Sequence, residues 1–170
     1  GRMPVMGLAT AHLHFSDDGE AVFVRVVNAG KTEIMRVALS GEEAIQTVIG
    51  GERVANLQDK HGEWLLYAVD SINQTPDLYI AKTDGSYERQ LTHINDAFLA
   101  DIVLPEYEKL HFTGTDGADV EGWYVKPTDG STGPYPTILW IHGGPHGCFG
   151  EHFAFDTQMF TGAGYGVLFI

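Results

Sequence analysis

The chain has a single cysteine, Cys148, among its 170 residues, so no internal disulfide can form. Its ten lysines and arginines are outnumbered by 23 aspartates and glutamates, which gives a formal net charge of −13. This shortage of positive charge argues against nucleic acid, whose phosphates require Lys and Arg, and against anionic membrane surfaces. No apolar run approaches the roughly 20 residues of a membrane-spanning helix. We therefore expect a globular protein whose partners are neither nucleic acid nor membrane.

The first residues, Gly1-Arg2-Met3-Pro4, lack the features of a signal peptide. The acidic balance fits solubility in a cytoplasm or in a salty medium, and we expect a cytoplasmic protein. We also expect its natural N-terminus to lie upstream of Gly1.

Motifs for a nucleophile or a metal are missing as well. None of the five serines stands in Gly-x-Ser-x-Gly; Ser131 comes nearest, but its spacing is wrong. His142 and His146 are four residues apart, yet Gly143-Gly144-Pro145 between them rules out the helix that would place both on one face. Cys148 has no pattern of a catalytic thiol around it. We expect no metal site and no cofactor.

The first hundred residues contain an internal repeat. Gly19–Val27 aligns with Gly62–Asp70 at an offset of 43, and Glu33–Val37 aligns with Asp77–Ala81 at an offset of 44. Repeats of about 40–45 residues with four short strands each are typical of β-propeller blades. The sequence therefore predicts about two blades, and a β-sandwich with a chance similarity is the alternative.

The repeat ends near Ile94, and the composition changes after it. Ile102–Glu106 has the pattern of an extended linker, so we place a propeller fragment at residues 1–104 and a second domain at residues 105–170. A hairpin, a strand buried on both faces, a short helix and a further strand are expected in turn at Lys109–Val125, Thr137–Ile141, Phe153–Ala163 and Tyr165–Ile170. Strand, loop, helix and strand form a βαβ unit, which requires a parallel sheet.

The expected strand Thr137–Ile141 runs directly into His142-Gly143-Gly144-Pro145. In α/β-hydrolases a glycine loop at this point provides one backbone N–H of the oxyanion hole. Glycine suits that task, because a Cβ would keep the substrate away from the N–H. The histidine is expected to shape the loop through hydrogen bonds.

The order of these features resembles the prolyl oligopeptidase superfamily of serine peptidases (family S9), most closely its acylaminoacyl-peptidase branch. The residues that carry the resemblance follow the repeat in the order Gly122-Trp123, Tyr135-Pro136, His142-Gly143-Gly144-Pro145-His146, Gln158 and Gly164-Tyr165-Gly166-Val167. The fold class that it implies is mixed β and α/β: a partial β-propeller followed by the N-terminal part of an α/β-hydrolase sheet.

The resemblance also implies an activity and its site. Gly144, with Gly143, would supply oxyanion N–H groups, and His142 and Pro145 would shape the loop. A Ser-Asp-His triad would lie outside this chain and cleave short peptides or N-acylated peptides. The chain would then be an inactive fragment whose strand Ile138–Ile141 lacks one neighbour, so it could aggregate or oligomerise. A fragment of an esterase or lipase, and a non-catalytic propeller-containing binding protein, are the alternative functions.

Overall fold

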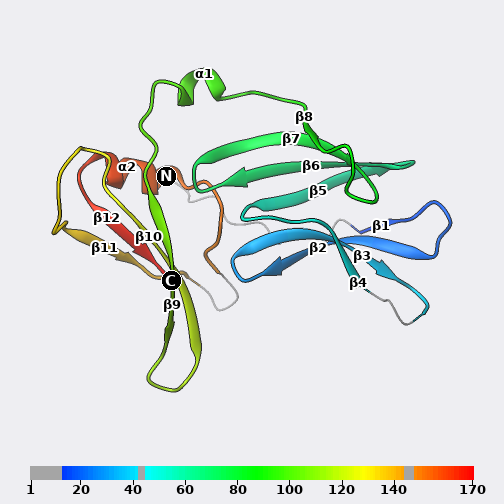
Figure 1. The fold of residues 1–170 in the computed structure, drawn as a ribbon, viewed down its shortest axis with the longest axis horizontal. Coiled ribbons are helices and arrows are strands. Elements are labelled where there is room, and N and C mark those ends of the chain that lie inside the picture. Colours follow the sequence, from blue (N-terminus) through cyan, green and yellow to red (C-terminus); the bar gives the residue numbers. More distant parts are fainter. Residues whose placement is uncertain (1–12, 42–44, 144–147) are drawn as a thin grey trace. The chain divides into compact units, whose positions relative to one another are not determined.

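The computed structural model describes residues 13–41, 45–143 and 148–170, and within them it is a mostly-sheet structure with two short helices (Figure 1). The described chain divides into two compact units. The first contains the residues up to Val69 together with Asp77–Thr92, and the second contains Asp70–Pro76 together with His93–Ile170. The domain boundary expected at residues 104 and 105 stays a prediction.

Eight strands form the sheet on which the first unit is built. In chain order they are β1 (His14–Phe15), β2 (Ala21–Asn28), β3 (Lys31–Ala38), β4 (Ile45–Ile49), β5 (Val54–His61), β6 (Trp64–Ser71), β7 (Gln74–Lys82) and β8 (Arg89–Gln90). They pair as two successive groups of four, which are joined by one parallel bridge between Thr32 and Val54. β6 begins 43 residues after β2, and β8 begins 44 residues after β4. The internal repeat of the sequence therefore has a counterpart in the strands.

Alternating positions of these strands supply the core of the first unit. Leu65, Tyr67 and Val69 of β6 are fully buried, as the two-residue period of a strand with one inward face requires. The Tyr67 hydroxyl donates a hydrogen bond of 2.6 Å to Glu88, which also forms an ion pair of 2.7 Å with Arg53. The core thus encloses a phenol whose polar end has a partner.

The second unit contains a four-stranded sheet in the order β11-β12-β10-β9. Its elements are α1 (Asp96–Leu99), β9 (Tyr107–Thr113), β10 (Asp119–Val125), β11 (Thr137–Trp140), α2 (Phe155–Gly162) and β12 (Gly166–Phe169). β9 and β10 form the expected antiparallel hairpin, and β11 pairs in parallel with β12 after the α2 crossover. The strand, helix, strand order expected from the sequence is therefore present.

The expected burial of Thr137–Ile141 on both faces is wrong, because Leu139 of β11 is 54% exposed. The expectation that this strand lacks one neighbour is confirmed, since β11 lies at an edge of the described sheet. In α2, Phe155 and Met159 are exposed, Phe160 packs against the second core, and the buried side chains are Thr157 and Thr161. The expected linker is also preceded by α1, whose four residues are too few to show a helical period in the sequence.

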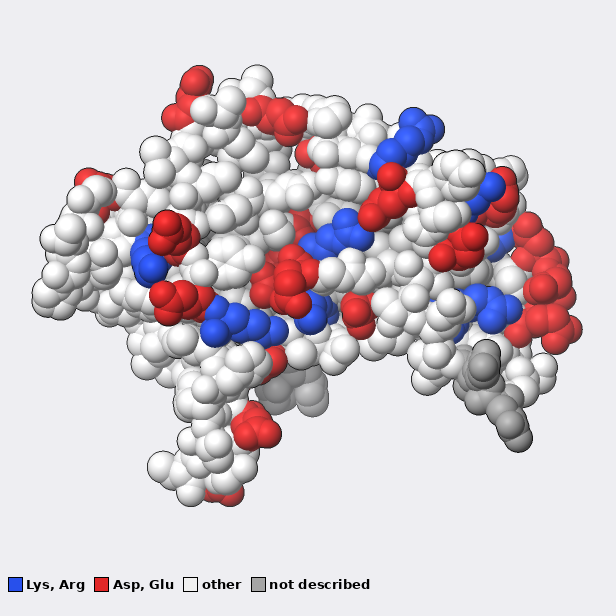
Figure 2. All heavy atoms as spheres, in the orientation of Figure 1, with Lys and Arg blue, Asp and Glu red and all other residues white. Residues whose placement is uncertain are grey.

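Acidic side chains outnumber basic ones on the face of the molecule shown in Figure 2, as the composition requires. Within the described residues, no helix has both the length and the apolar character needed to cross a membrane.

Candidate active site

The glycine loop leaves the second sheet where the sequence predicts. β11 ends at Trp140, and Ile141, His142 and Gly143 follow in an exposed, irregular conformation. The His142 Nδ1 lies 3.0 Å from the carbonyl oxygen of Gly143. A Cβ placed on Gly143 would meet no atom of the described residues within 4 Å, so none of them covers this backbone. The other predicted loop residues, Gly144 and Pro145, lie outside the described residues.

Aromatic contacts join the two flanks of the loop. The ring of Phe149, which follows the loop, lies 6.2 Å from the ring of His142, which precedes it. Phe149 also contacts Trp140 at 5.8 Å and Phe169 at 5.3 Å. The described flanks of the loop therefore pack against each other and against the ends of β11 and β12.

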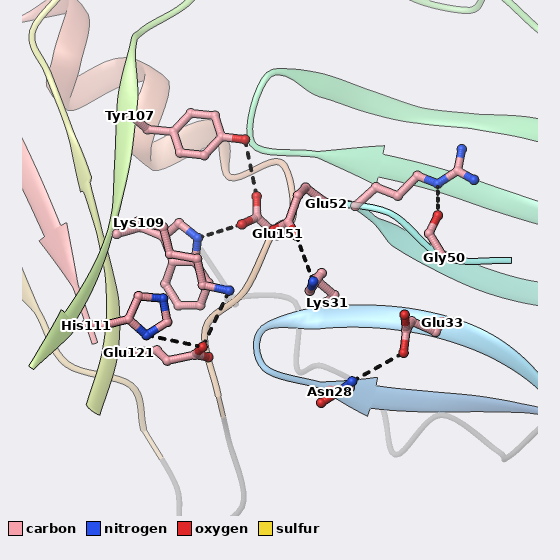
Figure 3. Close-up of polar contacts among 12 residues, drawn as sticks. Asn28, Lys31, Glu33, Gly50, Glu52, Tyr107, Lys109, His111, Glu121 and Glu151 are labelled. Carbon is pink, nitrogen blue, oxygen red and sulfur yellow. Dashed lines mark hydrogen bonds and ion pairs between the residues drawn. The ribbon is translucent and has the colours of Figure 1, made fainter. Parts of the chain in front are cut away.

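Glu151 connects the second flank of the loop to the hairpin of β9 and β10. Its carboxylate is 1% exposed and accepts hydrogen bonds of 2.8 Å from the Trp123 indole N–H and 3.3 Å from the Tyr107 hydroxyl (Figure 3). Each oxygen has its own donor. A buried carboxylate is costly unless donors replace its lost water, and these two strands supply them.

The donors of Glu151 belong to one face of the hairpin. Tyr107 and Lys109 are two residues apart on β9 and so share a face of the hairpin, and Trp123 is the cross-strand partner of Lys109. The Lys109 ammonium lies 5.3 Å from the centre of the Trp123 ring and 3.5 Å from Glu121. The indole is thus stacked on one side by a cation while its N–H points to Glu151.

The chain after Glu151 has two further tethers. The Phe153 backbone N–H donates to Asp70 at 3.0 Å, and the Gln158 side chain donates to the carbonyl oxygen of Ile72 at 3.1 Å. Asp70, near the end of β6, and Ile72, in the β6–β7 turn, both belong to the second unit. The segment between the loop and α2 is therefore fixed at Glu151 and Phe153, and α2 itself is fixed at Gln158.

Ser131, the serine nearest to a Gly-x-Ser-x-Gly pattern, has a local role. Its hydroxyl donates a hydrogen bond of 2.6 Å to Asp129 in an exposed turn. This hydrogen bond, with a second one from the Ser131 backbone N–H, lowers the pKa of Asp129 below its usual value. Such an arrangement stabilises a turn and leaves the hydroxyl engaged as a donor to a carboxylate.

Other residues with possible chemistry are scattered. Cys148 is exposed and is in no disulfide, and His146 lies outside the described residues. In the ranges that the structure describes, no three His, Cys, Asp or Glu side chains are grouped so that they could hold a metal ion.

The role of the glycine loop stays a prediction from the sequence, and the buried Glu151 was not predicted. The loop has a local signature in consecutive residues, whereas the partners of Glu151 lie 28 and 44 residues away in the sequence. The one available signal was a glutamate between Phe149 and Phe153, which by itself does not distinguish a buried carboxylate from an exposed one.

Comparison with curated proteins finds relatives named as peptidases. "Uncharacterized peptidase YuxL" of Bacillus subtilis (strain 168) is 38% identical over 88 residues, which cover 51% of this chain and 13% of that protein. Dipeptidyl-peptidase 5 of Schizosaccharomyces pombe is 28% identical over 107 residues, which cover 56% of this chain and 16% of that protein. The chain thus spans less than a fifth of the length of either relative. No established protein-family profile matches it.

Solved structures share the fold. The uncomplexed acylaminoacyl peptidase of Pyrococcus horikoshii matches with a TM-score of 0.77 and 23% identity, over 94% of this chain and 24% of that one. An acylaminoacyl peptidase in complex with Z-Gly-Gly-Phe-chloromethyl ketone matches with a TM-score of 0.73 and 22% identity, over 88% of this chain and 23% of that one. Together with the peptidase relatives, these matches confirm the resemblance to the acylaminoacyl-peptidase-like branch of family S9.

Proposed function

We propose that the chain is part of a serine peptidase that hydrolyses short peptides or N-acylated peptides, and that His142–Pro145 is its oxyanion loop. The observation that carries this proposal is the open backbone of Gly143 at the end of β11, beside a parallel β11–β12 pair. The peptidase relatives and a neighbour bound to a peptidyl chloromethyl ketone support a peptide substrate. The two groups of four strands support a propeller in front of the hydrolase sheet.

In this proposal the backbone N–H groups of Gly143 and Gly144 stabilise the charge that develops on the substrate oxygen. A serine hydroxyl adds to the carbonyl carbon while a histidine takes its proton, and the carbonyl oxygen becomes an oxyanion. Collapse expels the amine, which receives the proton, and water then releases the acid from the acyl-enzyme by the same steps. The loss of one oxyanion donor raises the barrier by roughly 3–4 kcal/mol in a comparable enzyme.

None of the five serines of this chain stands in the nucleophile pattern, so the proposal assigns the serine, its base and its acid to residues outside it. We expect the 170-residue chain to show no labelling by a fluorophosphonate probe, because donors without a nucleophile form no covalent adduct. Labelling of the purified chain would contradict this assignment.

The substrate class is tested on the complete protein that contains these residues. Acetyl-alanyl p-nitroanilide, alanyl p-nitroanilide and a short-chain nitrophenyl ester are compared by kcat/KM. Preference for the acetylated anilide supports an acylaminoacyl peptidase. Turnover of the ester alone would contradict the peptidase proposal and favour an esterase. Absence of turnover with all three substrates would favour a non-catalytic protein.

A further inference from the structure

Glu151 occupies a place that packing alone does not explain. Its side chain is 1% exposed beside the aromatic residues of the second core, where an apolar residue of similar size would avoid the cost of burying a carboxylate. Buried polar groups of this kind form directed hydrogen bonds, and these select one geometry out of several that apolar packing allows.

The two hydrogen bonds of Glu151 come from adjacent strands. The Trp123 indole N–H belongs to β10, which is paired on both sides, and the Tyr107 hydroxyl belongs to β9. Trp123 is 2% exposed and stacks on Phe169 of β12 at 5.5 Å. The anchoring point is therefore a rigid part of the sheet, which is the support that a precisely positioned loop requires.

The position of Glu151 in the chain connects this anchor to the loop. Gly150, directly before it, is buried, and Phe149 contacts the ring of His142 next to Gly143. A shift of Glu151 would displace Phe149 and, through the ring contact, His142 and the Gly143 backbone. A displacement of about 1 Å in a positioned catalytic group can cost on the order of 100-fold in rate.

We propose that Glu151 is a positioning residue for the oxyanion loop: its hydrogen bonds to Trp123 and Tyr107 fix the flank that sets the direction of the Gly143 backbone N–H. This inference rests on the proposed function. It assigns no contact between Glu151 and substrate. Its consequence is that loss of the two hydrogen bonds weakens transition-state binding and leaves substrate binding nearly unchanged.

The test uses the complete protein with Glu151→Leu, which keeps the bulk and removes both acceptors, and Glu151→Gln, whose amide oxygen still accepts from the indole. The probes are acetyl-alanyl p-nitroanilide and acetyl-alanyl aldehyde, whose hemiacetal oxygen takes the oxyanion position. We expect Glu151→Leu to lower kcat roughly 10- to 100-fold, with KM within about threefold of the wild-type value. The affinity for the aldehyde should fall by the same factor as kcat. The kcat of Glu151→Gln should stay within about threefold of the wild-type value.

Gln158→Leu is the matched control, because it removes a hydrogen bond of α2, which follows the Glu151 segment and is further from the loop in the chain. It should lower thermal stability without changing kcat. Equal losses of kcat in Gln158→Leu and Glu151→Leu would overturn the proposal, since a general loosening would then explain both. A kcat of Glu151→Leu within threefold of the wild type would also overturn it.

Tyr107→Phe covers the case in which Glu151→Leu fails to fold, because it deletes one hydroxyl and leaves the ring in place. We expect a smaller loss of kcat, about three- to tenfold, at unchanged KM. Unchanged kcat in this variant would then overturn the proposal. A wild-type protein that is inert toward the anilide would overturn the proposed function together with this inference, whereas an active wild type with an equally active Glu151→Leu overturns this inference alone.

Discussion

Tyr67 brings a titratable hydroxyl into the core of the first unit. Its side chain is fully buried, and its hydroxyl donates to Glu88 at 2.6 Å. Burial, followed by the hydrogen bond to Glu88 and the negative charge of that residue, raises the pKa of Tyr67 well above its usual value. Ionisation of Tyr67 is therefore far less favourable in the folded chain than in the unfolded one.

The raised pKa of Tyr67 predicts a loss of stability at alkaline pH. A group whose folded-state pKa lies above its unfolded value contributes stability that is complete below the unfolded pKa, about 10 for tyrosine, and is lost as pH rises beyond it. We expect Tyr67→Phe to reduce the free energy of unfolding by about 1–2 kcal/mol at pH 7, since a hydrogen bond to a charged group is lost. The deficit should shrink between pH 9.5 and 11, measured by urea unfolding.

Tyr87→Phe is the control for this prediction, because Tyr87 is 73% exposed. The free energy of unfolding of Tyr87→Phe should stay within about 0.5 kcal/mol of the wild-type value, both at pH 7 and at alkaline pH. A Tyr67→Phe variant that is as stable as the wild type at pH 7 would show that the hydrogen bond to Glu88 makes no net contribution to the free energy of unfolding.

Single residues of the site differ in how far the sequence could reveal them. His142 and Gly143 belong to a contiguous pattern at the end of a strand, and that pattern has a chemical reason that can be read without a structure. Glu151 acts through Trp123 and Tyr107, and nothing in the sequence pairs these three positions. Contacts between distant segments are set by packing, so the supporting residues of a site are harder to predict than its loop.

Elements were predicted where the sequence has a period or a turn signal. The β9–β10 hairpin follows from the Thr115-Asp116-Gly117 turn between two alternating segments, and β12 follows from its run of apolar residues. α1 has no such signal. The exposure of Leu139 in β11 could not be predicted from composition, because an apolar strand has the same composition inside a sheet and at its edge, whereas the missing neighbour of this strand was predicted correctly.

The two edge strands of the second sheet have different chemistry. β9 carries Glu108, Lys109 and His111, and charged or polar side chains discourage pairing with another chain. β11 carries no charged residue, and Leu139 is 54% exposed, followed by Ile141 at 65%. We therefore expect β11 to be the edge through which the 170-residue chain associates with further copies.

A charge on β11 should prevent that association. Leu139→Lys places an ammonium on the exposed side of the strand and leaves its backbone pairing with β12 unchanged. We expect the wild-type chain to show a mass that rises with concentration in size-exclusion chromatography with light scattering, and the variant to shift toward the monomer. Phe112→Lys on β9, an edge that already has charges, is the control and should not change the mass. A wild-type chain that stays monomeric at all concentrations would contradict the expectation.

At the scale of the whole molecule, charge is unbalanced. If every one of the ten Lys and Arg residues paired with a carboxylate, 13 of the 23 acidic residues would still lack a basic partner. Most of the ion pairs have a well-exposed acidic side chain, as between Lys31 and Glu52 or Lys82 and Glu63. Such pairs contribute about 0–1 kcal/mol each, so repulsion among the carboxylates is the electrostatic effect that should dominate.

Salt should therefore stabilise the chain. Between 0.01 and 1 M ionic strength the screening length falls from about 30 Å to about 3 Å, which removes long-range repulsion before it weakens close contacts. We expect the urea midpoint to rise with NaCl over this range, and Glu20→Gln to flatten the rise, because Glu20 lies in an exposed turn beside Asp17 and Asp18. Sucrose at equal osmolality is the control, because it is excluded from the protein surface but does not screen charge. It should raise the urea midpoint of the wild type and of Glu20→Gln equally. A midpoint that falls with NaCl would mean that the ion pairs outweigh the repulsion, and the net charge would then not govern the stability of this fold.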